Sequence, residues 1–173
     1  MKGVPVYIAL LRAVNVGGTG KLPMAELKRL CTGCGFAKVR TYIASGNVVF
    51  ESALARSEVK QRLEAALADF AGRPVGVLLR TAKELAAVLA ANPFPDAQPS
   101  RTVTIFLDDP APKRSIEEAK GRRTEEFVLG KREIYVHYRD GMGQSKLVIP
   151  AARQGTARNM NTIAKLVAMA TEH

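Results

Sequence analysis

The sequence predicts an α+β protein made of two similar halves, each with an antiparallel sheet and helices packed on one face of it. Two observations support this fold class. Short apolar or alternating runs, typical of strands, are interspersed with segments whose apolar residues recur at helical spacing. In the first half these segments follow the order βαββαβ, which is the ferredoxin-like order. The second half repeats it as βαββα, without the final strand.

The first half begins with an apolar strand and continues with clear stop signals between its elements. Gly33 and Gly35 end the first helix, and Gly72 and Pro74 end the second. The β-rich runs on either side of Ala44-Ser45-Gly46-Asn47 predict a hairpin. The expected elements are a strand over 7–11, a helix over 23–34, hairpin strands over 39–43 and 48–50, a helix over 59–70 and a strand over 75–80.

The second half is expected to follow a helix and a proline-rich linker. Thr81 and Glu84 have capping-box spacing before an alanine-rich helix that runs to about Ala91. The expected elements are then a strand over 102–107, a short helix over 116–120, hairpin strands over 126–129 and 133–138, and a C-terminal helix with its apolar stripe over 160–170. The predicted domains are 1–91, a linker over 92–100 and 101–173, which can form one compact unit.

Positive charge is concentrated near the two ends of the chain. The formal net charge is +10, of which residues 1–50 contribute +6 and residues 141–173 contribute +3. If the fold brings these segments together, they form one basic face suited to phosphate or nucleic acid. A basic, solvated surface without a ligand is the alternative.

The stretch from Tyr7 to Met24 predicts a strand, a glycine-rich turn and a helix start. Backbone N–H groups at such a junction can hold an anion, to which Arg12, Asn15 and Lys21 add charged or polar side chains. The turn is not a nucleotide-hydrolase loop, because asparagine, leucine and proline stand where that loop needs its first glycine, its hydroxyl and a free amide.

Two further segments contain candidate ligand-binding residues. Ser45 and Asn47 can present a hydroxyl and an amide from the predicted hairpin, although Asn and Gly in hairpins often only support the turn. Lys146 lies in a polar loop. Arg158 and Asn161 belong to a predicted helix start rich in long polar side chains.

On that predicted helix, Arg158, Thr162 and Lys165 would share one face, away from the apolar stripe. Such a face suits phosphate groups or base edges. The alternative is an internal network in which the asparagine side chains satisfy loop carbonyls.

Several kinds of chemistry lack support in the sequence. Cys31 and Cys34 form a C-x-x-C pair at a helix end, where the dipole opposes a thiolate, so we expect a structural role and neither a metal nor a cofactor. His137 is the only histidine before the C-terminal residue, so no catalytic triad is recognisable. No apolar run is long enough to cross a membrane, and we expect a cytoplasmic protein.

Motifs spread over the chain resemble those of one bacterial family. YIALLRAVNVGG, KLPMAELKRL, VRTYIASGNVVFES, ANPF, SKL and TARNMNT resemble the family known as domain of unknown function 1697. The resemblance implies an α+β fold with ferredoxin-like character and leaves the activity unassigned. Ala13 stands where the family commonly has Gly, and Met160 where it commonly has Trp, which removes a ring that could stack on a base.

The leading hypothesis is a binding protein for a phosphorylated small molecule or a nucleic acid. Its expected ligand-binding residues are Arg12, Asn15, Lys21, Ser45, Asn47, Lys146, Arg158 and Asn161. The first alternative is an enzyme on a small phosphorylated metabolite, with three of the cations as an electrostatic clamp. The second is a structural or partner-binding protein.

Overall fold

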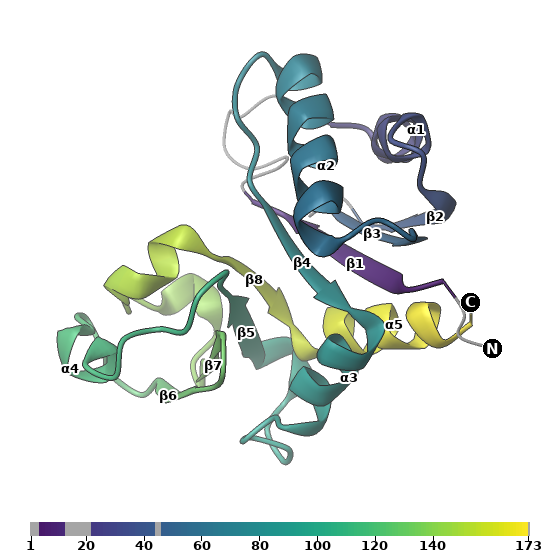
Figure 1. Cartoon of the computed structure of the whole chain (residues 1–173). Helices are drawn as coiled ribbons and strands as arrows, with labels where there is room; N and C mark the ends of the chain where they lie inside the picture. The colour runs from purple at the N-terminus through teal and green to yellow at the C-terminus, as the bar shows by residue number, and fades with distance from the viewer. Residues whose placement is uncertain (1–3, 13–21, 44–45, 173) are drawn as a thin grey trace. The chain divides into compact units, whose positions relative to one another are not determined.

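The structure, a computed structural model, describes residues 4–12, 22–43 and 46–172. The contacts divide the chain into two units, Met1–Ala86 with Leu166–His173, and Ala87–Lys165. Each unit contains a four-stranded antiparallel sheet and helices, which confirms the predicted α+β class (Figure 1). The residues from Leu166 onward belong to the first unit, whereas the sequence placed them in the second.

The first unit has the predicted ferredoxin-like order. Its sheet has the strand order β2-β3-β1-β4, so β1 lies between β3 and β4. The elements are β1 (Val6–Leu11), α1 (Met24–Gly33), β2 (Ala37–Tyr42), β3 (Asn47–Glu51), α2 (Arg56–Ala71) and β4 (Val77–Thr81), followed by α3 (Ala82–Ala90). The predicted capping box is confirmed at the start of α3, where the backbone N–H of Glu84 donates to Thr81 Oγ1 at 3.2 Å and that of Thr81 donates to Glu84 Oε1 at 2.8 Å.

One face of this sheet packs against α1 and α2. The core contains Ala9, Phe50 and Leu79 from the strands with Leu27 from α1 and Leu63 from α2. The other face is also covered, which the sequence did not predict. Arg40 of β2 donates to the Met169 carbonyl and, at 2.8 Å, to Glu172 Oε2, so the C-terminal turns of α5 (Met160–Thr171) lie against that face.

The second unit has its own sheet, with the strand order β6-β7-β5-β8. Its remaining elements are η1 (Pro99–Arg101), β5 (Thr102–Phe106), α4 (Ser115–Glu118), β6 (Glu126–Leu129), β7 (Glu133–His137), η2 (Met142–Gln144), η3 (Pro150–Gln154) and β8 (Thr156–Asn159). One face of the sheet packs in a core with Ile105, Phe127 and Ile149. On the other face, the Tyr135 hydroxyl donates to the Val88 carbonyl of α3 at 2.9 Å.

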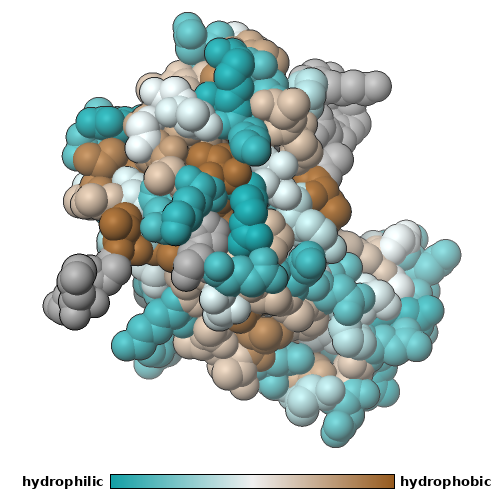
Figure 2. All heavy atoms as spheres, turned by 90° about the vertical axis from the view of Figure 1, so that its right-hand side faces the viewer, coloured by the Kyte–Doolittle hydropathy of each residue, from teal (hydrophilic) through white to brown (hydrophobic). Residues whose placement is uncertain are grey.

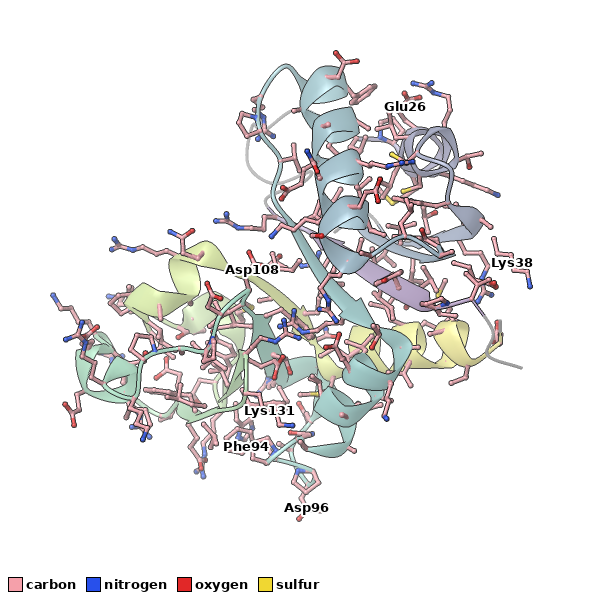
Figure 3. The ribbon with its side chains drawn as sticks, viewed as in Figure 1. Glu26, Lys38, Phe94, Asp96, Asp108 and Lys131 are labelled. Atoms are coloured by element: carbon pink, nitrogen blue, oxygen red, sulfur yellow. The ribbon has the colours of Figure 1, made fainter. Side chains whose placement is uncertain are left out.

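Residues 92–100, predicted as a linker, are part of this second unit. The ring of Phe94 (labelled in Figure 3) lies 5.7 Å from that of His137, and Thr102 Oγ1 donates to the Gln98 carbonyl at 3.1 Å. The three prolines therefore shape an ordered connection. They interrupt periodicity without detaching the segment from the fold.

The two sheets share one topology, including a final strand that the sequence analysis left out of the second half. Strand β8 pairs with β5 as β4 pairs with β1. Arg158 and Asn159 were expected to begin the C-terminal helix, and this expectation is wrong because both lie in β8. The strand has only four residues, most of them polar, so its sequence shows no alternation of apolar and polar residues. Its pairing with β5 cannot be recognised from the local sequence, because the two strands are far apart in the chain.

Candidate functional site

Three connecting segments meet where β1 ends. The backbone N–H of Leu11 donates to the Gly46 carbonyl at 2.9 Å, and the N–H of Arg12 donates to the Gly76 carbonyl at 2.9 Å. The end of β1 is thus fixed between the β2–β3 hairpin and the residue before β4. Strand pairing with distant parts of the chain therefore brings Leu11 beside Gly46 and Arg12 beside Gly76.

The side chain of Arg12 lies over Gly76. A Cβ atom placed on Gly76 would be 2.9 Å from Arg12 Cδ and 3.5 Å from Arg12 Nη1. No Cβ contact is normally as short as the first of these, so the position of the Arg12 side chain depends on glycine at position 76. Sequence reasoning missed Gly76. The available signal was a glycine directly before a strand, which often marks a close approach.

Asn47 supports the hairpin from inside the protein. It is fully buried, and its Nδ2 donates to the Tyr42 carbonyl across the turn at 2.9 Å. Ile43 and Gly46 take the positive φ values of the turn, 47° and 86°. Asn47 therefore supports the connection between β2 and β3. The predicted residues Asn15, Lys21 and Ser45 lie outside the described part of the chain.

Arg158 lies in β8 of the second unit and is largely buried, with 6% of its surface exposed. Its Nη1 donates to Thr156 Oγ1 at 2.7 Å and to the Ala157 carbonyl at 2.9 Å. Burial lowers the pKa of Arg158 to about 10, because the charged form loses hydration. These contacts place the guanidinium within the fold of the second unit.

Arg80 occupies the equivalent position in the first unit. It faces Ile8 of β1 as Arg158 faces Thr104 of β5, and its Nη1 likewise donates to the preceding carbonyl, that of Leu79, at 2.9 Å. Each arginine also precedes the residue that caps the next helix. The repeat of this arrangement indicates that Arg158 belongs to the shared architecture of the two units.

The helix after Arg158 begins with an N-cap, which differs from both the predicted polar face and the predicted network of asparagines with loop carbonyls. Asn159 Oδ1 accepts a hydrogen bond from the backbone N–H of Thr162 at 2.9 Å, an ordinary N-cap. Thr162 is buried while Asn161 and Lys165 are exposed. The predicted polar face through Arg158, Thr162 and Lys165 is therefore wrong, because Arg158 lies in a strand and Thr162 faces the interior.

Lys146 is exposed, and its backbone is closely packed. A Cβ on Gly121 would lie 2.1 Å from the Lys146 carbonyl oxygen, and Gly121 has a φ of 73°. Neighbouring residues Lys120 and Val148 form an isolated antiparallel bridge. The Ser-Lys-Leu segment therefore lies next to Gly121, directly before the single antiparallel bridge at Val148.

The cysteine pair has the environment expected of a structural element. Cys31 is fully buried in the first core, and burial, with the nearby Cys34 thiol, raises its pKa to about 12. Burial also raises the pKa of Cys34, against the opposing charge of Arg62. Both environments disfavour the thiolate, which is the nucleophilic form.

Other classes of site find no support in residues 4–12, 22–43 and 46–172. These ranges contain no group of three or more His, Cys, Asp or Glu placed to hold a metal ion. They also contain no helix long and apolar enough to cross a membrane. Hydrophobic residues on the face in Figure 2 are scattered among hydrophilic ones, without a broad apolar patch.

These features define a two-unit α+β protein whose halves share one sheet topology. Residues 4–135 match the family described as "Protein of unknown function (DUF1697)", and the chain belongs to this family, as its motifs predicted. The chain is similar to the solved structure of the conserved bacterial protein SP0830 from Streptococcus pneumoniae, with 26% identity and a TM-score of 0.81. That similarity covers 98% of this chain and 99% of the other. No curated protein matches the sequence.

Proposed function

We propose that the protein binds a phosphate-bearing ligand at the end of β1 in its first unit. The observation that carries this proposal is the placement of Arg12. Its backbone donates to Gly76, its side chain lies over that glycine, and the preceding residue is bonded to the hairpin that contains Ser45. A guanidinium supplies a fork of donors that matches phosphate oxygens.

The surrounding sequence supports the same choice of ligand. Residues 13–21 connect the end of β1 to Leu22 and to the start of α1 at Met24, and they contain Asn15 and Lys21. The N-terminus of a helix favours anions because its first backbone N–H groups are unpaired. With a net charge of +6 in residues 1–50, this part of the chain favours polyanions over neutral ligands.

The proposal includes the cytoplasm as the place of action. Nucleic acids and phosphorylated metabolites are present there, and reducing conditions there match the two free cysteines. The resemblance to a bacterial family also leads us to propose that the protein comes from a bacterium.

The test combines fluorescence anisotropy on oligonucleotides with calorimetry on nucleotides and sugar phosphates. Nucleic-acid binding should weaken steeply with salt, because each phosphate contact releases counterions. In a plot of the logarithm of the binding constant against the logarithm of salt concentration, Arg12→Gln should reduce the slope by about 1, the value for one phosphate contact. The matched control is Lys38→Gln, which removes the same charge.

Lys38, labelled in Figure 3, is paired with Glu51, and Glu51 lies opposite Val6 at the other end of β1. Its variant should therefore bind as the natural protein does. Arg12→Lys separates loss of charge from loss of the guanidinium fork. The proposed site would be excluded if neither ligand class binds at low salt. It would also be excluded if Arg12→Gln and Lys38→Gln lose the same amount of affinity. Turnover of a bound small phosphate would make the protein an enzyme at the same site.

A further inference from the structure

The second unit contains a pocket with a volume of about 200 Å³. It lies between the residues that precede β6, namely Arg123 and Glu125, and the segment after β7. Drug-sized ligands occupy about 300–1,000 Å³, so this pocket suits a smaller molecule. All of its lining residues belong to the second unit, so the pocket is separate from the end of β1.

Hydrogen bonds fix the walls of the pocket. Glu125 Oε1 accepts from the backbone N–H of Arg123 at 2.6 Å, and Glu125 Oε2 accepts from the Ser145 hydroxyl at 2.5 Å. The Ser145 oxygen in turn accepts from the backbone N–H of Leu147 at 3.1 Å. These bonds lower the pKa of Glu125 and keep its carboxylate ionised, and the bond from Ser145 has the largest effect. Glu125 therefore joins the two sides of the pocket before any ligand arrives.

Four polar groups at the pocket remain without a partner in the part of the chain that the structure describes. They are the Arg123 guanidinium, the Tyr138 hydroxyl, the Gln144 amide and Asp140 Oδ1. Tyr138 is only 7% exposed. Its hydroxyl nevertheless remains accessible at the pocket, because Thr104 Oγ1 is the only buried side-chain polar atom without a hydrogen-bond partner among the described residues.

The charged residues at the pocket indicate which class of ligand it can bind. Burial and the negative charge of Glu125 raise the pKa of Tyr138, which keeps its hydroxyl protonated. Asp140 Oδ2 accepts from Thr124 Oγ1 at 2.6 Å, which fixes that carboxylate at the pocket. Two carboxylates disfavour a phosphate dianion here. The lone guanidinium of Arg123 nevertheless offers a site for one carboxylate.

We propose that this pocket binds a free α-amino acid. The amino acid's carboxylate pairs with Arg123, and its ammonium group pairs with Asp140. Arg123 and Asp140 form no ion pair with each other within 4.0 Å, so a zwitterion that bridges them satisfies both. The Tyr138 hydroxyl and the Gln144 amide supply further hydrogen bonds to the bound molecule.

The test is calorimetry of the full chain with each standard L-amino acid, together with the N-acetyl derivative and the methyl ester of any that binds. We expect at least one amino acid to bind with a dissociation constant of about 1 mM or below. Each derivative removes one charge and should bind about tenfold more weakly or worse. Tyr138→Phe should weaken binding while the hydrogen bonds of Glu125 stay in place.

Single-charge variants distinguish the two ends of the ligand. Arg123→Gln should abolish the preference for the free amino acid over its ester, and Asp140→Asn the preference over its N-acetyl form. Arg139→Gln is the control, since Arg139 is an exposed neighbour that pairs with Glu126. Absence of binding by every amino acid, or equal binding by the free molecule and both derivatives, would overturn the proposal. Neither result would bear on the phosphate site of the first unit.

Discussion

Replacing Gly76 by alanine is expected to displace Arg12 without unfolding the first unit. The three atoms nearest to the new methyl group all belong to the Arg12 side chain, with Cδ at 2.9 Å. A flexible side chain can rotate away from such a contact. The φ of Gly76 lies outside the left-handed region, so alanine can adopt the same backbone conformation.

The opposing effects on stability nearly cancel. Alanine restricts the unfolded chain and stabilises the protein by about 0.4–1 kcal/mol. Forcing Arg12 out of its rotamer costs about 0.5–1.5 kcal/mol. The free energy of unfolding should therefore change by less than about 1 kcal/mol. A charge-assisted hydrogen bond contributes about 1.5–3 kcal/mol, so losing the placed guanidinium should weaken phosphate binding about tenfold to a hundredfold.

The assay is anisotropy of a labelled single-stranded oligonucleotide at low salt, paired with urea unfolding of each variant. Gly33→Ala is the matched control, because nothing lies within 4 Å of its added Cβ. It should bind as the natural protein does. If Gly76→Ala also binds normally while Arg12→Gln does not, glycine at position 76 does not position the arginine.

Three further predictions concern the fold. Thr81→Ala should lower the free energy of unfolding by about 1 kcal/mol in urea titration, since it removes the capping box. Cys31 should resist alkylation at pH 8 in the folded protein and react once the protein is unfolded. A thiol with a pKa of about 12 is ionised at that pH in only about one molecule in 10,000. Rapid labelling of Cys31 in the folded protein would contradict its burial. Gly121→Ala should lower the free energy of unfolding by at least about 2 kcal/mol, because the added Cβ would lie 2.1 Å from the Lys146 carbonyl oxygen. Gly141 also has a positive φ, but nothing lies within 4 Å of its added Cβ, so Gly141→Ala should lower the free energy of unfolding by less.

Local chemistry made much of the fold predictable. The capping box of α3 and the glycine at positive φ after α2 act within a few residues, so their patterns are visible in the sequence. Strand β8 was missed because its evidence is its pairing with β5, about fifty residues earlier in the chain. The polar Arg-Asn pair looked like part of a helix. In the fold it is an arginine in a strand followed by an N-cap.

The candidate site was predictable only in part. A strand followed by a cationic, glycine-rich turn pointed to Arg12, and strand pairing places that residue beside Gly46 and Gly76. The sequence alone could not show that Asn47 is buried or that Arg158 repeats the position of Arg80. Both facts follow from contacts between strands far apart in the chain.

Chemical-shift mapping of the backbone amides tests the phosphate site most directly. Inorganic pyrophosphate and a 5′-phosphorylated oligonucleotide would be titrated into isotope-labelled protein at low salt. We predict that the largest saturable shifts occur at the amides of Leu11, Arg12, Gly46 and Gly76, and that Arg12→Gln removes them. Shifts confined to other residues, or unchanged in Arg12→Gln, would contradict a phosphate site at the end of β1.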